Sequence, residues 1–455
     1  MSPIPIKQQD TRSDESRLNI IIVGAGLAGL GCAISSLLAG HRVHILESAT
    51  EIKEVGAGIQ ILPNSSRVLQ HWGIDAQLLP HATIPRFCNF LGWKGNHISR
   101  LDFSASEAQY PGTWYRDFHR ADLQTCLVDR ALELGVRLTC SVRIVDVRVS
   151  PADGAVATAI ASDGREFPAD LVIGADGVFG KLTEILLHRP DPPLQTGDLA
   201  YRVLLSTEAM LRDPELREFV TDPQVNYWLG PDKHAVNYVL RGGKLFNMVL
   251  LVPDDIPEDS LATTVEGNVQ EMCALFEGWD PRIQKLLKLC ESVQKWKLCI
   301  RLGDCDWMHP SGAWVMVGDA VHATLPYLAS GAGMAFEDGA VLGEVLSRLP
   351  QTSKSSPEFL AAKRHALAVF EKCRKQRTQM VVKRGNVQQY LYHLHDGPEQ
   401  EERDAKMQMV PTPEGECLAW RDPGLAPVLL GYDHVADVDR NWGSIEQESP
   451  RVSRL

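Results

Sequence analysis

The chain has 455 residues, which is long enough for two or three domains with a sizeable buried core. Its formal net charge of −12 and its lack of a basic block argue against binding to nucleic acid or to an anionic membrane surface. The ten cysteines are scattered, with no CxxC pair and no zinc-like spacing, so we expect reduced thiols, no metal site and a cytoplasmic protein.

The N-terminal part contains one segment that resembles a membrane span. Residues 1–17 are polar and predict a disordered lead-in. Residues 18–40 carry no charged side chain and are long enough to cross a bilayer. However, their β-branched run stops at closely spaced glycines and is followed by a helical pattern, which favours a strand, a turn and a helix over a membrane span.

A βαβ unit is the first predicted structure. Residues 19–23 form a buried-type strand, residues 27–38 a helix with small residues on one face, and residues 42–46 a second strand. This order is typical of the start of a dinucleotide-binding domain.

The turn inside this unit reads GAGLAG. Gly24 permits a tight turn, Gly26 lets the backbone approach a pyrophosphate, and Gly29 permits contact between helix and strand. Glu47 ends the second strand 18 residues after Gly29, where an acid can hold a ribose hydroxyl. The alternative is a structural glycine turn with an incidental surface glutamate.

The middle of the chain predicts a change of architecture. Residues 122–134 have the pattern of an amphipathic helix, and 137–149 and 166–173 have the pattern of strands. Several β-rich runs between residues 198 and 252 predict a separate antiparallel sheet.

The last third is mainly helical by pattern. Residues 264–290 predict helix, 313–317 a strand, 332–348 a long helix, and 358–394 a further helical stretch. The remainder is rich in Pro, Asp and Glu and predicts an irregular tail on the surface.

A second motif joins the strand at 313–317 to the following helix. Gly318 and Asp319 follow the strand, and the helix starts with Gly331, Ala332 and Gly333. A carboxylate at this position can accept hydrogen bonds from a ribitol chain, while the helix N-terminus can stabilise negative charge on a reduced isoalloxazine. The two motifs together therefore predict FAD. For His322, nearby in the sequence, we favour a buried core histidine without a role in the site.

Several stretches resemble one family, the group A FAD-dependent monooxygenases. Within it, the chain is most similar to the fungal salicylate hydroxylase-like branch, which includes dearomatising phenol- and indole-alkaloid-oxidising enzymes. The resemblance runs from Asn19 to about Trp442. The matching stretches are VGAGLAGLG (23–31), LE (46–47), EVGAGIQILPNSSRVLQHWG (54–73), HRADL (119–123), VIGADG (172–177) and VGDAVHATLPYLASGAGMAFED (317–338).

The resemblance implies an α/β fold. A Rossmann-type FAD-binding domain, like that of glutathione reductase, would be interleaved with an antiparallel-sheet substrate domain and followed by a helical C-terminal region. The implied parts are 18–85 with 116–190 and 291–350 for FAD, 86–115 with 191–290 for substrate, and 351–455 for the C-terminal region and tail.

The resemblance also implies site residues. The residues implied to contact FAD, besides the first glycines, are Glu47, Ala57, Gly58, Arg120, Asp319, Gly331 and Ala332. Arg202 and Tyr238 match the family's active-site arginine and tyrosine. From the residues alone, Arg120 could instead pair with Asp122, Arg202 could lie on a solvated sheet face, and Tyr238 could be a core residue.

One segment departs from the family pattern. The family commonly continues GADG with Arg, Ser and a further Arg, whereas Phe179, Gly180 and Thr183 stand at those places in GADGVFGKLTE (174–184). Because this segment is linked to FAD and nicotinamide handling, the choice between NADPH and NADH stays open. Lys181 is a candidate for a compensating positive charge.

The implied reaction is a monooxygenation. NAD(P)H would reduce FAD, and O₂ would react to a flavin C4a-hydroperoxide that transfers one oxygen atom to an electron-rich ring. The expected substrate is a phenolic polyketide or an indole alkaloid of fungal secondary metabolism, and the expected assembly is a monomer or weak homodimer.

Three rival functions remain at this stage. A flavin-dependent halogenase would carry a WxWxIP run, which the sequence lacks. A plain NAD dehydrogenase would bind no flavin. Another FAD oxidoreductase would bind flavin but would not transfer oxygen to a substrate. A non-catalytic, redox-responsive flavoprotein would instead bind a partner through its acidic surface.

Overall fold

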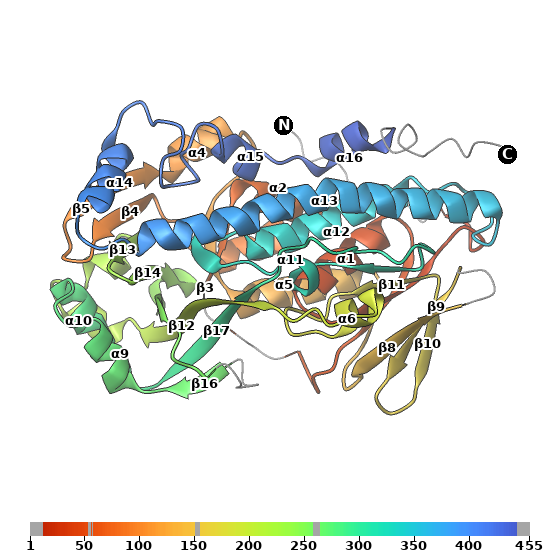
Figure 1. Cartoon of the computed structure of the whole chain (residues 1–455), viewed down its shortest axis with the longest axis horizontal. Coiled ribbons are helices and arrows are strands. Elements are labelled where there is room, and N and C mark those ends of the chain that lie inside the picture. The colour runs from red at the N-terminus through yellow and green to blue at the C-terminus, as the bar shows by residue number, and fades with distance from the viewer. Residues whose placement is uncertain (1–11, 53–55, 57, 151–154, 258–263, 444–455) are drawn as a thin grey trace.

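The computed structural model describes residues 12–52, 56, 58–150, 155–257 and 264–443. Two large sheets lie toward opposite ends of an elongated molecule, and a long helix, α13 (Pro357–Tyr392), runs along both (Figure 1). In the part of the chain that is described, no helix is both long enough and apolar enough to cross a bilayer.

The first sheet is the predicted Rossmann-type sheet. Its five strands are all parallel, in the order β18 (Trp314–Met316), β11 (Leu171–Gly174), β1 (Asn19–Val23), β2 (Arg42–Leu46) and β7 (Arg137–Thr139). The three strands β18, β11 and β1 are almost entirely buried and apolar, as is usual for parallel strands covered on both faces. The predicted βαβ unit is confirmed, with helix α1 at Leu27–Leu38.

Helices α1 and α12 (Gly331–Ser347) pack unusually closely. A Cβ atom on Gly339 would lie 2.6 Å from the carbonyl carbon of Gly31, and one on Gly343 would lie 2.5 Å from Cβ of Ser35. The two backbones can therefore touch only because glycines stand at these positions.

The second sheet has eight strands. Their order is β16 (Thr264–Gly267), β17 (Val293–Ile300), β12 (Leu194–Ser206), β15 (Leu245–Pro253), β14 (Lys233–Leu240), β13 (Val225–Gly230), β4 (Phe87–Gly92) and β5 (His97–Asp102). All neighbours are antiparallel except β13 and β4, which are parallel. The predicted antiparallel sheet is thus nearly right.

Two predictions near this sheet need correction. Residues 293–300 pair with β12 as β17, so they belong to this sheet and not to the FAD-binding domain. The predicted helix over 264–290 instead begins with β16 and then forms α9 (Val269–Leu275) and α10 (Pro281–Leu287). Asn268 separates strand from helix because its side chain accepts the N–H groups of Gln270 and Glu271.

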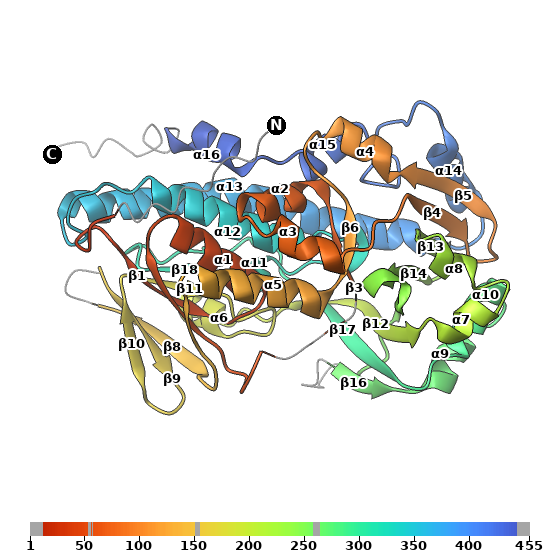
Figure 2. The same ribbon diagram turned by 180° about the vertical axis from the view of Figure 1, so that it is seen from behind.

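The remaining elements are two smaller sheets and several helices. Strands β3 (Gly58–Ile61) and β6 (Arg116–His119) form a ribbon, and β8 (Ile144–Val149), β9 (Ala157–Ala161) and β10 (Glu166–Ala169) form a separate small sheet (Figure 2). The predicted runs 137–149 and 166–173 are therefore each divided between two sheets. The helices are α2 (Pro63–His71), α3 (Asp75–Leu78), α4 (Phe103–Gln109), α5 (Arg120–Glu133), α6 (Leu182–Leu187), α7 (Glu208–Arg212), α8 (Glu218–Thr221) and α11 (Asp319–His322).

The C-terminal part is not an irregular tail. It contains α14 (Pro398–Gln408), α15 (Ala426–Leu430) and α16 (His434–Trp442). The apolar run from Cys417 to Trp420 is buried in the same core as β13 and β14. Four apolar residues between polar stretches are too short a pattern to predict this burial.

The predicted lead-in is also partly wrong. Arg12 is buried, and its guanidinium donates to the carbonyls of Leu346, Ser347 and Leu349 at the end of α12, at 3.1, 2.8 and 2.9 Å. A cation at a helix C-terminus satisfies carbonyls that lack partners within the helix. Residues 12–17 thus belong to the fold, and the rest of the predicted lead-in lies outside the described residues.

Candidate active site

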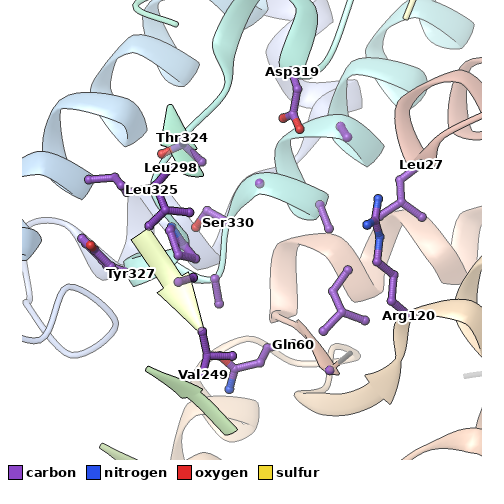
Figure 3. Close-up of a pocket in the computed structure, with 18 of the residues that line it drawn as sticks. Leu27, Gln60, Arg120, Val249, Leu298, Asp319, Thr324, Leu325, Tyr327 and Ser330 are labelled. Carbon is purple, nitrogen blue, oxygen red and sulfur yellow. The ribbon is translucent and has the colours of Figure 1, made fainter. Parts of the chain in front are cut away.

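One cavity is lined by residues that follow β1, β11 and β18 of the first sheet and by residues of the second sheet, and Figure 3 shows part of its lining. The starts of α1 and α12 line one part of it, and strands β12, β14 and β15 line another. In Figure 3, Arg120 and Leu27 lie on one side of the cavity, and Leu325 and Tyr327 lie on the other. The cavity therefore joins the two sets of residues that the sequence predicted for cofactor and substrate.

Two helix N-termini face this cavity. The N-cap residues of α1 and α12, Gly26 and Ser330, form no side-chain cap, and neither helix has an acidic residue in its first turn. Gly331 and Ala332 line the cavity directly. The unpaired N–H groups and the positive ends of both helices are thus available to an anionic or electron-rich ligand.

The three predicted glycines differ in what surrounds them. Gly24 has a φ of +106°, and a Cβ on Gly29 would lie 2.0 Å from the carbonyl oxygen of Gly24, so both are required by the turn. A Cβ on Gly26 would meet no protein atom within 4 Å. Gly26 thus leaves open space at the start of α1, where the motif predicts a pyrophosphate.

Glu47 lies at the end of β2, as predicted. Its carboxylate accepts the N–H groups of Ala25 at 2.7 Å and Ala49 at 2.8 Å. It therefore holds the glycine turn, and its remaining lone pairs are available to a ribose hydroxyl.

Arg120 does not form the alternative ion pair with Asp122. The carboxylate of Asp122 is instead bound by Arg241, with distances of 2.7 and 2.8 Å. Arg120 has no hydrogen bond or ion pair within the described part of the chain, and burial lowers the pKa of its guanidinium. It is a cavity-lining cation that lacks a close partner.

Asp319 lines the same cavity from the first position of α11. Its side chain is accessible to the cavity and forms no hydrogen bond with any described residue. Desolvation raises its pKa, an effect that His322 and Arg120 oppose. A free carboxylate and a free guanidinium in one cavity suit a ligand with both hydroxyl and phosphate groups.

Arg202 on β12 faces the cavity and not bulk solvent. Its guanidinium lies over the ring of Trp296, 4.3 Å from the centroid, and its buried Nε has no hydrogen-bond partner among the described residues. Burial, with a contribution from nearby Arg120, lowers the pKa of Arg202 to about 10. An anionic or polar ligand would offset the free-energy cost of burying this guanidinium without a hydrogen-bond partner.

Tyr238 on β14 also lines the cavity and is 5 % exposed. Burial raises its pKa well above the usual range, so the phenol is neutral. A Cβ on Gly58 would lie 2.5 Å from the hydroxyl oxygen of Tyr238, and the N–H of Gly58 donates to Asn247 at 2.9 Å. Gly58 is therefore needed for close contact with the sheet, while Ala57 lies outside the described residues.

Sequence reasoning missed several cavity residues. His234, Val236 and Tyr238 lie two positions apart on β14, and all three line the cavity. Since alternate residues of a strand share a face, Tyr238 could have identified His234. Tyr327, which follows Pro326, gave no comparable periodic signal.

The departing GADG segment has its own packing. A Cβ on Gly180 would lie 2.1 Å from the carboxyl carbon of Asp176, and that carboxylate accepts the N–H of Leu182 at 3.0 Å. Lys181 instead pairs with Glu184 at 2.9 Å on the surface. Arg301 contacts this segment, since its Nε donates to the carbonyl of Val178 at 3.0 Å, and its guanidinium pairs with Asp191 at 2.6 Å.

His322 is a buried core residue, as we favoured. Its Nε2 lies 2.6 Å from Asp338, whose other carboxylate oxygen accepts from Arg374. Asp338 also accepts the N–H of Gly318 at 2.8 Å. This buried cluster fixes the loop that carries Asp319.

Comparisons with known proteins agree with this architecture. The model of the FAD binding domain family matches residues 17–384. The chain is 40% identical over 429 residues to the FAD-dependent monooxygenase OpS4 of Beauveria bassiana, covering 93% of this chain and 96% of that protein. It is 31% identical to the 3-amino-4-hydroxybenzoate 2-monooxygenase PtnB3 of Streptomyces platensis, covering 90% and 97%.

A solved salicylate hydroxylase substrate complex shares the fold. It superposes with a TM-score of 0.75 at 22% identity, covering 94% of this chain and 98% of that chain. The family match and the 40% identity extend over most of the chain. This protein therefore belongs to the family of FAD-dependent monooxygenases.

Proposed function

We propose that this FAD-dependent monooxygenase inserts one oxygen atom from O₂ into a phenolic polyketide or a fused indole alkaloid, in secondary metabolism of the fungal type. The single observation that carries the proposal is the shared cavity, which joins two free helix N-termini to an apolar sheet surface bearing Arg202 and Tyr238. The name of the related PtnB3, a hydroxybenzoate monooxygenase, supports a hydroxylated ring.

The residues present fit FAD. The open space at Gly26 and the start of α1 suit the pyrophosphate, Glu47 suits the ribose, and Arg120 and Asp319 offer a cation and an acceptor to the remaining polar groups. The start of α12 at Gly331 and Ala332 suits the electron-rich end of the ring system. When bound and reduced by NAD(P)H, FAD supplies the activation of O₂.

The chain's own residues would bind and orient the aromatic substrate. Arg202 is a buried cation, so it would favour the ionised form of a substrate hydroxyl and thereby raise the electron density of the ring. Tyr238 can donate a hydrogen bond to the same oxygen. The apolar side chains of Val249 and Leu251 would exclude water around the ring.

The proposal also includes the cellular compartment and the oligomeric state. The ten free cysteines support a reducing compartment, which we take to be the cytoplasm. We expect a monomer or a weak homodimer.

The proposal is tested with the purified, FAD-loaded protein. NADH and NADPH oxidation is measured in parallel over a panel of phenolic polyketides and prenylated indoles, and oxygenated products are identified by mass. We expect one substrate class to stimulate nicotinamide oxidation with matching product. Halide-dependent product would favour a halogenase, and stimulated consumption that releases only peroxide, or no stimulation at all, would contradict the proposal.

A further inference from the structure

A second cleft lies at the other ends of β1 and α1, away from the cavity described above. It is bordered by the start of β1, the end of α1, the start of β2 and the segment between α5 and β7. Its volume of about 910 Å³ is within the range of pockets that hold small organic ligands. Within the described residues, the two cavities share no lining residue. A ligand could therefore occupy the second cleft while FAD is bound.

Arginines give this cleft a positive charge. We call it the arginine cleft, because its described lining includes Arg17, Arg42 and Arg137 but no aspartate or glutamate. The carboxylate of Asp14, outside this lining, lies 2.7 Å from Arg42 and 3.8 Å from Arg17. Three guanidinium groups and one carboxylate leave two positive charges, although the chain as a whole carries a net charge of −12. The arginine cleft therefore favours an anionic ligand over a neutral one.

One further carboxylate near the cleft is already neutralised. Asp170 accepts the N–H of Asn19, a lining residue, at 2.7 Å. The ammonium group of Lys354 lies 2.6 Å from the same oxygen of Asp170. Asp170 thus does not cancel the charge of the arginines.

Arg137, at the start of β7, is an exposed cation that a ligand can reach. It forms no hydrogen bond or ion pair with any described residue. Burial and nearby Arg137 lower the pKa of His44, another lining residue, so the charge of Arg137 acts on the interior of the cleft. A guanidinium without a partner can bind two oxygens of a phosphate or carboxylate through parallel N–H groups.

The other two arginines differ in how firmly they are held. Arg42 is 51 % exposed and its partner Asp14 is 76 % exposed. Because exposed ion pairs contribute little to stability, Arg42 can exchange Asp14 for a ligand at low cost. Arg17 is only 18 % exposed, and its Nη2 donates to the carbonyl of Arg12 at 3.0 Å. Arg17 therefore supplies a fixed positive charge beside two cations that can move toward a ligand.

Helix capping does not explain these arginines. The C-termini of α1 and α5 border the cleft, and helix C-termini attract cations. However, backbone N–H groups already close both helices, at distances of 2.9 to 3.1 Å, and these belong to Gly40 and His41 for α1 and to Gly135 and Val136 for α5. Within the described residues, neither Arg42 nor Arg137 donates to a helix carbonyl. The two guanidinium groups are thus left for a ligand.

An apolar surface lies in the same cleft. Leu37, Leu38 and Leu134 are half-buried and Pro168 is exposed, and all four line the cleft. The cleft is also much larger than an inorganic ion requires. Its ligand should therefore carry an organic body next to its anionic group.

We propose that the arginine cleft binds a phosphate monoester whose organic part is about the size of a nucleoside. A phosphate monoester carries close to two negative charges at neutral pH, which matches the two positive charges of the cleft. The phosphate would lie between Arg42 and Arg137, and the organic part would lie on Leu37, Leu38 and Leu134. Binding is non-covalent, and it neither uses the active-site cavity nor depends on the proposed function.

The proposal is tested by calorimetric titration of the FAD-loaded protein at fixed ionic strength. The probes are adenosine monophosphate, geranyl monophosphate and inorganic phosphate. We expect at least one ester to bind roughly tenfold or more tightly than inorganic phosphate, because its organic part is removed from water. Tighter binding of adenosine monophosphate would identify a nucleotide ligand, and tighter binding of geranyl monophosphate would identify a phosphorylated lipid.

Substitutions locate the binding site. Arg137→Gln and Arg42→Gln should each weaken binding of the preferred ester roughly tenfold or more, since each removes hydrogen bonds to a charged group. Arg137→Lys keeps the charge but not the planar fork, so it should weaken binding less. Arg148→Gln is the control: Arg148 is exposed and paired with Asp146 as Arg42 is with Asp14, but it lies outside the cleft. It should bind the ester with parental affinity.

Two further measurements exclude other causes. Because Arg137 has no partner among the described residues, Arg137→Gln should keep the parental Tm without ligand. The flavin absorbance should show that no FAD is released during the titration. Binding of both esters no tighter than that of inorganic phosphate, parental affinity in Arg137→Gln, equal weakening by Arg148→Gln, or release of FAD by the preferred ester would overturn the proposal.

Discussion

The guanidinium groups of Arg120 and Arg202 converge on one point of the cavity wall. A Cβ on Gly56 would lie 3.5 Å from Nη1 of Arg120 and 3.6 Å from Nη1 of Arg202. Neither arginine forms an ion pair with a described carboxylate. Two buried positive charges placed this close together repel each other. A bound anion would offset the free-energy cost of this repulsion.

Replacement of Arg202 should separate substrate handling from cofactor binding. In Arg202→Met we expect product formation to fall roughly 10²-fold, because the variant loses the donor that stabilises a charged oxygen. FAD content should stay at the parental level, since the residue lies on the eight-stranded sheet, away from the glycine turn. Flavin absorbance and product yield measure the two effects, with the exposed Arg212→Met as a control. A parental rate of product formation would contradict the role of Arg202.

Asp319 should matter for cofactor retention and little for folding. Its carboxylate makes no hydrogen bond with the described residues, so Asp319→Ala should leave Tm near the parental value for the apoprotein. We expect FAD to be lost during gel filtration, whereas the exposed control Asp306→Ala should keep it. Full FAD occupancy in Asp319→Ala would show that the assignment is wrong.

Substitution of Gly26 should weaken FAD binding, whereas substitution of Gly29 should destabilise the fold. Gly26→Ala adds a methyl group to open space, so the apoprotein should fold normally and bind FAD more weakly. Gly29→Ala adds it 2.0 Å from a carbonyl oxygen. It should lower the free energy of unfolding by about 1–3 kcal/mol. Urea unfolding of the apoproteins and FAD titration separate the two effects. Equal FAD affinity in Gly26→Ala and the parent would contradict the expected approach of the pyrophosphate.

His41 should make the fold sensitive to acid. Burial and nearby Arg12 lower its pKa from 6.5 to about 3, while its Nδ1 accepts the N–H of Leu18 at 3.2 Å. The unfolded chain then binds the proton more readily, so this stabilisation is complete above pH 6.5 and is lost as the pH falls toward 3.

Urea unfolding at a series of pH values tests this expectation. The His41 contribution should fall by up to about 1.4 kcal/mol per pH unit. His41→Asn keeps an acceptor for Leu18 and should flatten the profile, while His97→Asn on the surface should not. Identical pH profiles for His41→Asn and the parent would rule out this source of acid sensitivity.

The sequence predicted those features that depend on local pattern. The β1–α1–β2 unit and its glycines have short-range causes, since the turn, the strand and the helix each impose a residue type. Asp319 and the start of α12 at Gly331 could be found for the same reason. The roles of these residues in binding FAD stay predictions.

The features that were missed depend on long-range pairing. Strand β17 belongs to the large sheet only because it pairs with β12, almost a hundred residues earlier. The convergence of Arg120 and Arg202 depends on how the start of α5 and strand β12 approach Gly56, and the contact of His234 with His393 depends on where α13 ends. No periodicity within one segment contains this information.

The glycine contacts between α1 and α12 have a mechanical consequence. Because the backbones of α1 and α12 are in contact at Gly31 and Gly339, the two helices have no room for a larger side chain between them at this point. The N-termini of both helices, which line the cavity, are therefore held at a fixed separation. We expect any change in the width of the cavity to come from the wall formed by β12, β14 and β15.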